Sequence, residues 1–358
     1  MKRTRKEVII IGCYQPLLRV EDRSKWTKAK DGHLYHPAKI TGTKQLEWYN
    51  KELITPYTKT EIIPCGKCAG CRLDYSRDWA NRAYLESLSW KHNYFVTLTY
   101  DDNALYIPDI METSDGFTYT EIEEQEWKGI LIPDDFRRFL NTFRKIMERE
   151  YKATNIRFIG CGEYGKEYRR PHYHLILFNC PLPTDTFYHP RVNYGKYEYY
   201  QNTIIERAWQ KGISNICPAT WNNMAYTARY IMKKQNGKES EDYYAMRGQI
   251  KEFFRSSLQP GIGRKYYEDH KEEIYRIDKI MIKNQGGTHW TQPPKYFDKL
   301  FEKENPEEFE KIKQKRKKQM IQNLKLKAQT TSLTQWEQLQ IELESLENKA
   351  KQLKRPEF

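Results

Sequence analysis

Two short apolar runs joined by a polar connection constrain the fold of this chain more than any other part of its sequence. The first run, IRFIGCGEYG, covers residues 156–165, and the second, HYHLILFN, covers residues 172–179. Because the connection between them, KEYRRP, is short and polar, the two runs predict an antiparallel β-hairpin. We therefore expect an antiparallel sheet in the middle of the chain.

Other segments alternate between helical and extended patterns. The helix that begins at Pro133 has the clearest apolar stripe, which consists of Phe136, Phe139, Leu140, Phe143 and Met147. Helices are predicted over residues 74–90, 133–150 and 222–236, and strands over residues 94–100, 156–165, 172–179 and 213–217. This order, with a hairpin in the middle, predicts an α+β fold in which helices flank an antiparallel sheet.

Charge is distributed unevenly along the 358 residues, which carry a net charge of +13. Residues 101–135 contain eleven acidic residues and one Lys, so we interpret residues 101–133 as an acidic surface insertion. Residues 311–358 contain twelve basic and five acidic residues in helical sequence. We predict an N-terminal segment over residues 1–60, a main domain over residues 61–300 and a basic helical tail over residues 301–358.

Composition limits the classes of protein to which the chain can belong. Its aromatic content of 14% is too high for a disordered chain, and no apolar run approaches the ~20 residues that span a bilayer. The basic charge indicates a polyanionic partner, for which nucleic acid is favoured over a membrane, while a charge that only aids solubility is the alternative. An odd count of seven Cys and the absence of a leader pattern predict a soluble intracellular protein.

A pair of histidines in the second apolar run is the sharpest chemical signal. Residues two apart on a strand share a face, so His172 and His174 lie side by side while Tyr173 faces the other way. The hairpin can bring Glu163 next to them, and two imidazoles with one carboxylate suit Mg²⁺, Mn²⁺ or Zn²⁺. The alternative is a pair of histidines used in surface or core packing.

The helix predicted over residues 222–236 carries two tyrosines one turn apart. Tyr226 and Tyr230 share a face of this helix, and Lys233 follows on nearly the same face. Aromatic residues at this spacing usually belong to a core, which is the alternative here. A phenol with a pKa of about 10 is a poor nucleophile unless cationic charge or a metal-activated electrophile lies nearby.

Three cysteines at the spacing Cys65-x-x-Cys68-x-x-Cys71 form a partial metal motif. Structural zinc usually has four ligands, so Cys13 or a distant His would have to complete the site. Reduced free thiols are the alternative. Core positions are expected for the cysteines in apolar strands, namely Cys161, Cys180 and Cys217.

In order and spacing, these features resemble three motifs of the HUH endonuclease superfamily, the rolling-circle replication initiators. The strand YFVTLTY (94–100) resembles the F-x-T-L-T motif, residues 172–174 the His-hydrophobe-His strand, and residues 226–234 the Y-x-x-K helix. Over about residues 60–300 the chain also resembles the replication initiation proteins of microviruses of the gokushovirus group. CGKCAGCR (65–72), GEYG before RPHYH, the doubled tyrosine and PGIGRKYY (260–267) carry that second resemblance.

The resemblance implies an HUH endonuclease domain over residues 61–300 and a role for each motif residue. His172 and His174 would bind Mg²⁺ or Mn²⁺, with Glu163 as the third ligand. The nucleophiles would be Tyr226 and Tyr230, assisted by Lys233.

One departure concerns the first of two overlapping Y-x-x-basic units, which has Arg229 where Lys is usual. Arg cannot exchange a proton at neutral pH, so Tyr230 is favoured as the initiating nucleophile. DNA contacts are expected from basic residues near the motifs, namely Arg170, Arg229 and Lys234. A structural Zn²⁺ would bind at Cys65, Cys68 and Cys71.

The implied reaction is a metal-assisted transesterification of single-stranded origin DNA, which leaves a 5′-phosphotyrosine and a free 3′-OH. It would initiate and terminate rolling-circle replication of a small circular single-stranded DNA phage genome in the cytoplasm of the infected bacterial host. No G-x-x-x-x-G-K-[ST] pattern occurs, so helicase and DNA polymerase would come from the host. The alternatives are a non-catalytic single-stranded nucleic-acid-binding protein and another HUH enzyme, a relaxase or transposase.

Overall fold

The fold is taken from a computed structural model, which describes residues 13–30, 34–42, 58–106, 129–165, 169–192, 198–233, 244, 248–284, 286–333 and 335–352. The chain divides into two compact units. The first comprises Met1–Asp74 with Asn305–Arg355, and the second comprises Tyr75–Glu304 with Pro356–Phe358. None of the described helices is both long enough and apolar enough to cross a membrane. The three segments expected from the sequence, with boundaries near residues 60 and 300, stay a prediction.

The first unit contains a three-stranded antiparallel sheet in the order β4-β1-β5. Its strands are β1 (Leu17–Asp22), β4 (Ala38–Gly42) and β5 (Thr58–Ile63). Leu18 and Val20 alternate along β1 and are buried. The short strands β2 (Thr27–Lys28) and β3 (Leu34–Tyr35) pair with each other, and the helices α9 (Pro306–Gln329) and α10 (Gln335–Gln352) complete the unit. The helical C-terminal extension is therefore confirmed, whereas these strands were not predicted.

A seven-stranded antiparallel sheet forms the centre of the second unit, in the order β12-β7-β8-β6-β11-β10-β9. The strands are β6 (Asn93–Thr99), β7 (Arg157–Tyr164), β8 (Pro171–Phe178), β9 (Phe187–Val192), β10 (Glu198–Asn202), β11 (Ser214–Pro218) and β12 (Phe253–Ser256). The predicted hairpin is confirmed, because β7 and β8 are antiparallel neighbours with Glu163 opposite His172. Strand β8 lies between β7 and β6, well inside the sheet.

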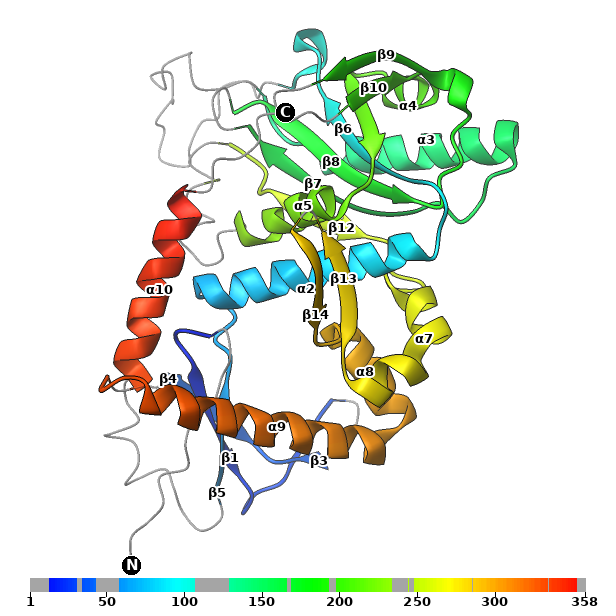
Figure 1. Cartoon of the computed structure of the whole chain (residues 1–358). Coiled ribbons are helices and arrows are strands. Elements are labelled where there is room, and N and C mark those ends of the chain that lie inside the picture. Colours follow the sequence, from blue (N-terminus) through cyan, green and yellow to red (C-terminus); the bar gives the residue numbers. More distant parts are fainter. Residues whose placement is uncertain are drawn as a thin grey trace, which may run out of the picture. The chain divides into compact units, whose positions relative to one another are not determined.

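Helices cover both faces of this sheet, as the predicted α+β fold requires (Figure 1). On one face lie α3 (Pro133–Tyr151) and α4 (Thr203–Trp209), whose apolar residues pack with Tyr173. On the other lie α2 (Ala69–Leu88), which begins in the first unit, and α5 (Trp221–Lys233). This second layer contains Phe95, Ile176, Met224 and Tyr226.

Local sequence explains how α3 packs so closely on the sheet. Pro133 occupies the first turn, and the predicted stripe from Phe136 to Met147 is buried. The ring of Phe136 lies against the backbone of β7, since a Cβ at Gly160 would come within 2.8 Å of it. Gly162 leaves the same kind of space for Phe253, where a Cβ would approach within 2.7 Å. The two glycines of IGCGEYG are therefore required by aromatic packing on this face.

The rest of the second unit was not predicted in detail. It comprises α7 (Arg264–Ile277), the β13 (Ile280–Asn284) and β14 (Gly287–Thr291) ribbon, α8 (Lys295–Glu304), and the short 3-10 turns η2 (Asp102–Ala104) and η3 (Thr184–Thr186). Tyr275 on α7 stacks on Phe301 of α8 with ring centroids 3.8 Å apart. Of the predicted acidic insertion over residues 101–133, residues 107–128 lie outside the described part of the chain.

Candidate functional site

Three side chains from the β7–β8 hairpin converge on the face of the sheet that carries α5. The Nε2 atoms of His172 and His174 lie 2.8 and 2.9 Å from the same oxygen, Oε1 of Glu163. Glu163 and His174 are 2% and 1% exposed, and His172 is partly exposed. The sequence prediction that these three residues lie together is confirmed as a matter of position.

The outer nitrogen of each imidazole has a partner of its own. His172 Nδ1 lies 3.0 Å from the carbonyl oxygen of Arg170, and His174 Nδ1 lies 3.0 Å from the hydroxyl oxygen of Thr97 on β6. A carbonyl only accepts hydrogen bonds, so His172 Nδ1 must carry a proton. In the neutral ring, the lone pair of His172 Nε2 would then face the carboxylate of Glu163, and such a contact requires a positive charge between the two atoms.

A divalent cation fits this requirement. Two ligands that bind one ion at about 2.1 Å and at a right angle lie about 3 Å apart, close to the two distances found here. Imidazoles whose second nitrogen is hydrogen-bonded, together with a carboxylate, are a donor set common to Mg²⁺, Mn²⁺ and Zn²⁺ sites. The residues present therefore fit the group that the sequence pattern implies.

The electrostatics of Glu163 favour its charged form. Burial by itself would raise the pKa of the carboxyl group, but hydrogen bonds from His172 and His174 hold that pKa below its ordinary value of 4.5. A buried carboxylate that stays ionised over the whole physiological pH range is a permanent negative charge at the site.

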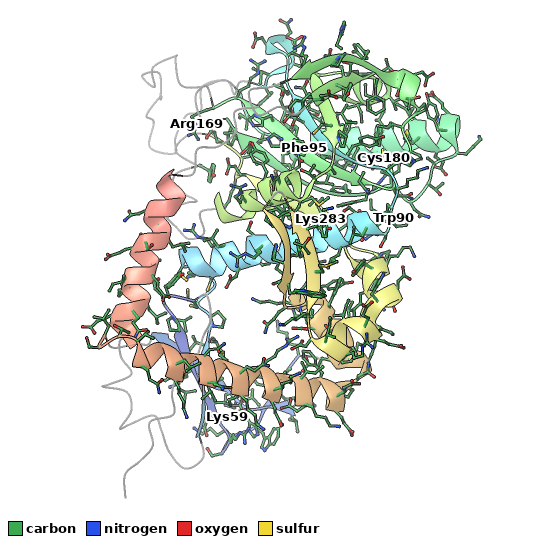
Figure 2. All side chains as sticks on the ribbon, in the orientation of Figure 1. Lys59, Trp90, Phe95, Arg169, Cys180 and Lys283 are labelled. Carbon is green, nitrogen blue, oxygen red and sulfur yellow. The ribbon has the colours of Figure 1, made fainter. Side chains whose placement is uncertain are left out.

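Two neighbouring residues on β6 were not identified from the sequence. Thr97 faces His174 directly across the β6–β8 ladder, and the ring of Phe95 stacks on His174 with centroids 5.5 Å apart at 10° (Figure 2). Both belong to the strand YFVTLTY, which was recognised as a motif without a role for its members. The signal was the two-residue period of that strand, which puts Phe95 and Thr97 on one face.

Tyr226 is the tyrosine of α5 whose side chain is described, and it lies at the His–Glu group. Its hydroxyl is 3.5 Å from Glu163 Oε1, and its ring meets that of His174 edge-on with centroids 5.1 Å apart. Phe95 contacts the same ring at 6.2 Å. The side chain is partly buried, so the phenol combines a fixed ring with access from solvent.

Other predicted residues of the tyrosine helix are only partly described. Tyr230 and Lys233 lie within α5, but their side chains are outside the described part of the structure, and Lys234 is outside it altogether. The preference for Tyr230 as first nucleophile therefore stays a prediction. Arg229 is exposed and has one hydrogen bond, from Nε to the carbonyl oxygen of Ala225 at 3.4 Å.

Arg170 has structural partners in addition to the predicted DNA contact. Its Nε donates a hydrogen bond to the carbonyl oxygen of Tyr100 at 3.1 Å, and its Nη1 pairs with Asp102 at 2.6 Å. These bonds tie the residue before the His strand to the end of β6. The guanidinium still keeps about a quarter of its surface exposed, at 26%.

The four cysteines near the N-terminus of α2 form a second group that could hold a metal ion. Cys13, Cys65, Cys68 and Cys71 lie with their sulfur atoms within 4.8 Å of one another, so Cys13 takes the fourth place that the sequence left open. Cysteines predicted in the core are buried, namely Cys161, Cys180 and Cys217.

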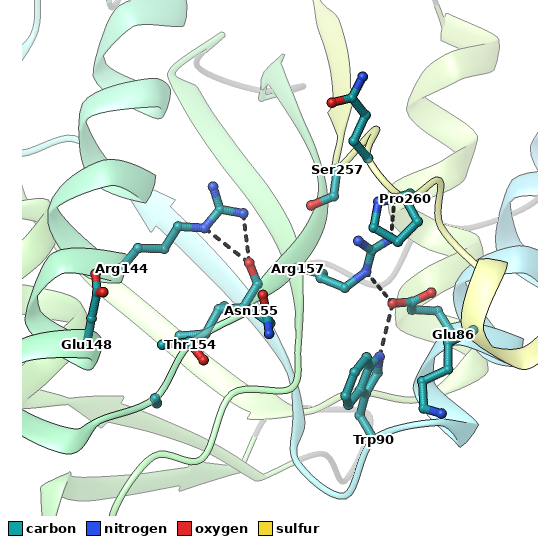
Figure 3. Close-up of a pocket in the computed structure, with 13 residues that line it drawn as sticks. Glu86, Trp90, Arg144, Glu148, Thr154, Asn155, Arg157, Ser257 and Pro260 are labelled. Atoms are coloured by element: carbon teal, nitrogen blue, oxygen red, sulfur yellow. Dashed lines mark hydrogen bonds and ion pairs between the residues drawn. The ribbon is translucent and has the colours of Figure 1, made fainter.

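A cavity of about 620 Å³ lies at the opposite end of β7 from the His–Glu group (Figure 3). At its wall Arg157 pairs with Glu86 at 2.5 Å, and Trp90 donates a hydrogen bond to the same carboxylate at 3.0 Å. Arg157 and Glu163 are six positions apart on one strand, which corresponds to about 20 Å. The cavity is therefore separate from the metal group.

The same buried charges hold the segment PGIGRKYY. Arg157 donates to the carbonyl oxygen of Pro260 at 2.7 Å, and Glu86 accepts the backbone N–H of Gly263 at 2.6 Å. Arg82 lies between the rings of Trp79 and Tyr296. These contacts give this sequence motif a role in the packing of the second unit.

Comparison with known proteins assigns a family to this architecture. The family model of the replication-associated protein ORF2 matches residues 93–235. That segment begins at the first residue of β6 and ends just after α5, so it contains the His–Glu group and the tyrosine helix.

Three relatives carry related names. The chain is 35% identical over 303 residues to the replication-associated protein ORF2 of Spiroplasma virus 4, covering 84% of this chain and 87% of the relative. It is 28% identical over 268 residues to the replication-associated protein VP4 of Bdellovibrio phage phiMH2K, covering 73% and 74%. To the replication-associated protein ORF4 of Chlamydia phage 1 it is 29% identical over 175 residues, covering 48% and 38%.

No solved structure matches the chain. The match to the Spiroplasma virus 4 protein covers most of both chains at an identity above 30%. The chain therefore belongs to the ORF2 family of phage replication-associated proteins, of the gokushovirus type.

Proposed function

We propose that this protein nicks and rejoins single-stranded DNA by tyrosine transesterification and thereby starts and ends rolling-circle replication of a small circular phage genome. One observation carries the proposal, namely the Tyr226 hydroxyl 3.5 Å from Glu163 Oε1, beside two imidazoles that bind the same oxygen. A phenol next to a set of metal ligands is the arrangement that attack on a phosphodiester needs.

In this proposal, Glu163, His172 and His174 hold one divalent cation, Mg²⁺ or Mn²⁺. When bound, the cation supplies Lewis-acid polarisation of the phosphate that is cut. The carboxylate contributes the negative charge that retains the ion, and Thr97 and the carbonyl of Arg170 orient the two imidazoles.

The protein residues carry out the exchange itself. A bond forms between a tyrosine oxygen and phosphorus, the bond from phosphorus to the 3′ oxygen breaks, and the phenol proton ends on that 3′ oxygen. One phosphodiester replaces another, so no ATP is required. The second tyrosine of the Tyr226–Tyr230 pair would attack in the joining step, with Lys233 supporting the charge on a tyrosinate.

DNA binding would use the positive charge of the chain and exposed basic residues such as Arg229. Arg170 and Lys234 are further proposed contacts. Host helicase and DNA polymerase would open and copy the duplex. The names of the relatives support a replication role over that of a relaxase or transposase.

The test is a covalent-capture assay with a single-stranded DNA library, because the origin sequence is open. The full-length protein is incubated with Mn²⁺ or Mg²⁺ and library DNA labelled at either end, and adducts are separated on a denaturing gel. A 5′-phosphotyrosine link predicts that the 3′ label moves with the protein, while the 5′ label appears in a shorter free fragment.

Variants separate nicking from binding. The double variant Tyr226→Phe/Tyr230→Phe should form no adduct, whereas Tyr266→Phe on α7, outside the site, should form as much as the wild type. His174→Ala should lose the adduct but keep salt-dependent DNA binding. If the wild type binds DNA and gives no adduct with either cation, the non-catalytic binding protein is the better description.

A further inference from the structure

The four-cysteine group in the first unit joins three separate points of the chain. Cys13 precedes β1, Cys65 follows β5, and Cys68 and Cys71 lie at the beginning of α2. Cys13 and Cys68 are buried. Nothing in the proposed nicking reaction uses these thiols, so their convergence over 52 residues needs another explanation.

The spacing of the sulfur atoms fits a single bound ion. Cys65 Sγ and Cys71 Sγ are 3.9 Å apart, and Cys13 Sγ and Cys68 Sγ are 4.0 Å apart. Four thiolates at the corners of a tetrahedron, each about 2.3 Å from a zinc ion, lie about 3.8 Å from one another. A disulfide requires about 2.05 Å, and all four cysteines are free.

Backbone N–H groups also point at these sulfur atoms. Cys65 Sγ accepts from the N–H of Lys67 at 3.4 Å and of Cys68 at 3.2 Å, across a turn in which Gly66 has φ of +71°. Cys13 Sγ accepts from the N–H of Cys65 at 3.2 Å. Donors directed at sulfur stabilise a thiolate, the form that binds a metal.

We propose that one zinc ion binds to the thiolates of Cys13, Cys65, Cys68 and Cys71. An all-sulfur tetrahedral site selects zinc or iron over Mg²⁺ and Mn²⁺, and a closed four-ligand set is typical of structural zinc. Each thiol releases its proton on binding.

The zinc ion would fasten the small sheet of the first unit to the first turn of α2. Along β1, only Leu18 and Val20 are fully buried, which is a small apolar core for a sheet of three strands. Small units of this kind commonly need a metal or another crosslink to fold stably. This proposal is independent of the nicking activity.

Metal analysis of the full-length protein tests it. Protein purified under reducing conditions and passed through a mild chelator should retain one zinc per chain by mass spectrometry of the elements. Cobalt substituted for zinc should give the intense visible absorption of a tetrahedral tetrathiolate, a readout that needs no variant. His174→Ala should leave both results unchanged, which assigns the zinc to the cysteines.

Variants identify the ligands. Cys13→Ser and Cys68→Ser should lose the zinc, while the control Cys217→Ala, from the core of the second unit, should keep it. Cys13→His, which still offers a ligand, should keep zinc and shift the cobalt spectrum even if the serine variants fail to fold. Iron in place of zinc, a disulfide among the four cysteines, or no retained metal after reconstitution would each overturn the proposal.

Discussion

His174 Nδ1 lies 3.0 Å from the hydroxyl of Thr97, its direct partner across the β6–β8 ladder. A hydroxyl that accepts from Nδ1 leaves the lone pair of Nε2 free for a metal ion. Thr97→Val should therefore weaken Mn²⁺ binding by about 10- to 100-fold, because loss of such a partner typically has that effect. Isothermal titration calorimetry measures the change.

Thr99→Val is the matched control for Thr97→Val. Thr99 lies on the same strand opposite His172, whose Nδ1 is held by the carbonyl of Arg170 instead of a threonine. Its Mn²⁺ affinity should equal that of the wild type. Equal weakening in both variants would mean that the strand, and not the Thr97 hydroxyl, is responsible.

Tyr173 should matter for folding and not for the reaction. Its hydroxyl is buried on the opposite face from the His pair, 2.7 Å from the Tyr100 hydroxyl, and it donates to the carbonyl of Ile132 at 2.9 Å. Tyr173→Phe should lower the free energy of unfolding by about 1–3 kcal/mol, since it leaves buried partners unsatisfied. Urea unfolding measures this loss, and Mn²⁺ affinity of the folded variant should not change.

Arg229 and Arg170 should respond differently to substitution by alanine. Arg229 is exposed, so Arg229→Ala should reduce the salt dependence of DNA binding by about one unit of slope, measured by fluorescence anisotropy at several salt concentrations. Arg170→Ala also breaks the bond to the Tyr100 carbonyl, so it should lower the free energy of unfolding by about 1–3 kcal/mol. An unchanged stability for Arg170→Ala would count against its structural role.

The stability of the metal-free protein should depend on the ionisation of Glu163. Its pKa is lower in the folded state than the ordinary value of 4.5, so its stabilising contribution is complete above that pH and is lost as the pH falls toward the lowered pKa. With chelator present, Glu163→Gln should remove part of the acid-induced loss of stability seen in the wild type. Thermal unfolding between pH 7 and pH 3 measures both proteins, and parallel curves would contradict this prediction.

The His–Glu group could be predicted from the sequence because its geometry is local. The two-residue period of a strand puts His172 and His174 on one face, and a short connection sets Glu163 opposite them. The stripe of α3 was predictable for the same reason, as its helical period is complete within one segment.

Features that depend on distant pairing were not predictable in this way. Thr97 meets His174 only because β6 lies beside β8, 77 residues later in the chain. The strands β1 and β5 mix charged and apolar residues, and their pairing joins segments on either side of residues 43–57. Cys13 could be named as one possible fourth ligand, but its choice over a distant His depends on that sheet.

The central claim is that a tyrosine of α5 attacks DNA only when the His–Glu group holds a divalent cation. Trypsin cuts after Lys211, Arg229 and Lys233, so Tyr226 and Tyr230 fall in different peptides, residues 212–229 and residues 230–233. Mass spectrometry of nuclease-trimmed adducts should find the nucleotide on one or both of these peptides, and their ratio after one turnover shows which phenol attacks first. A nucleotide on any other peptide, or an equal yield of adduct in chelator or with His174→Ala, would contradict the account.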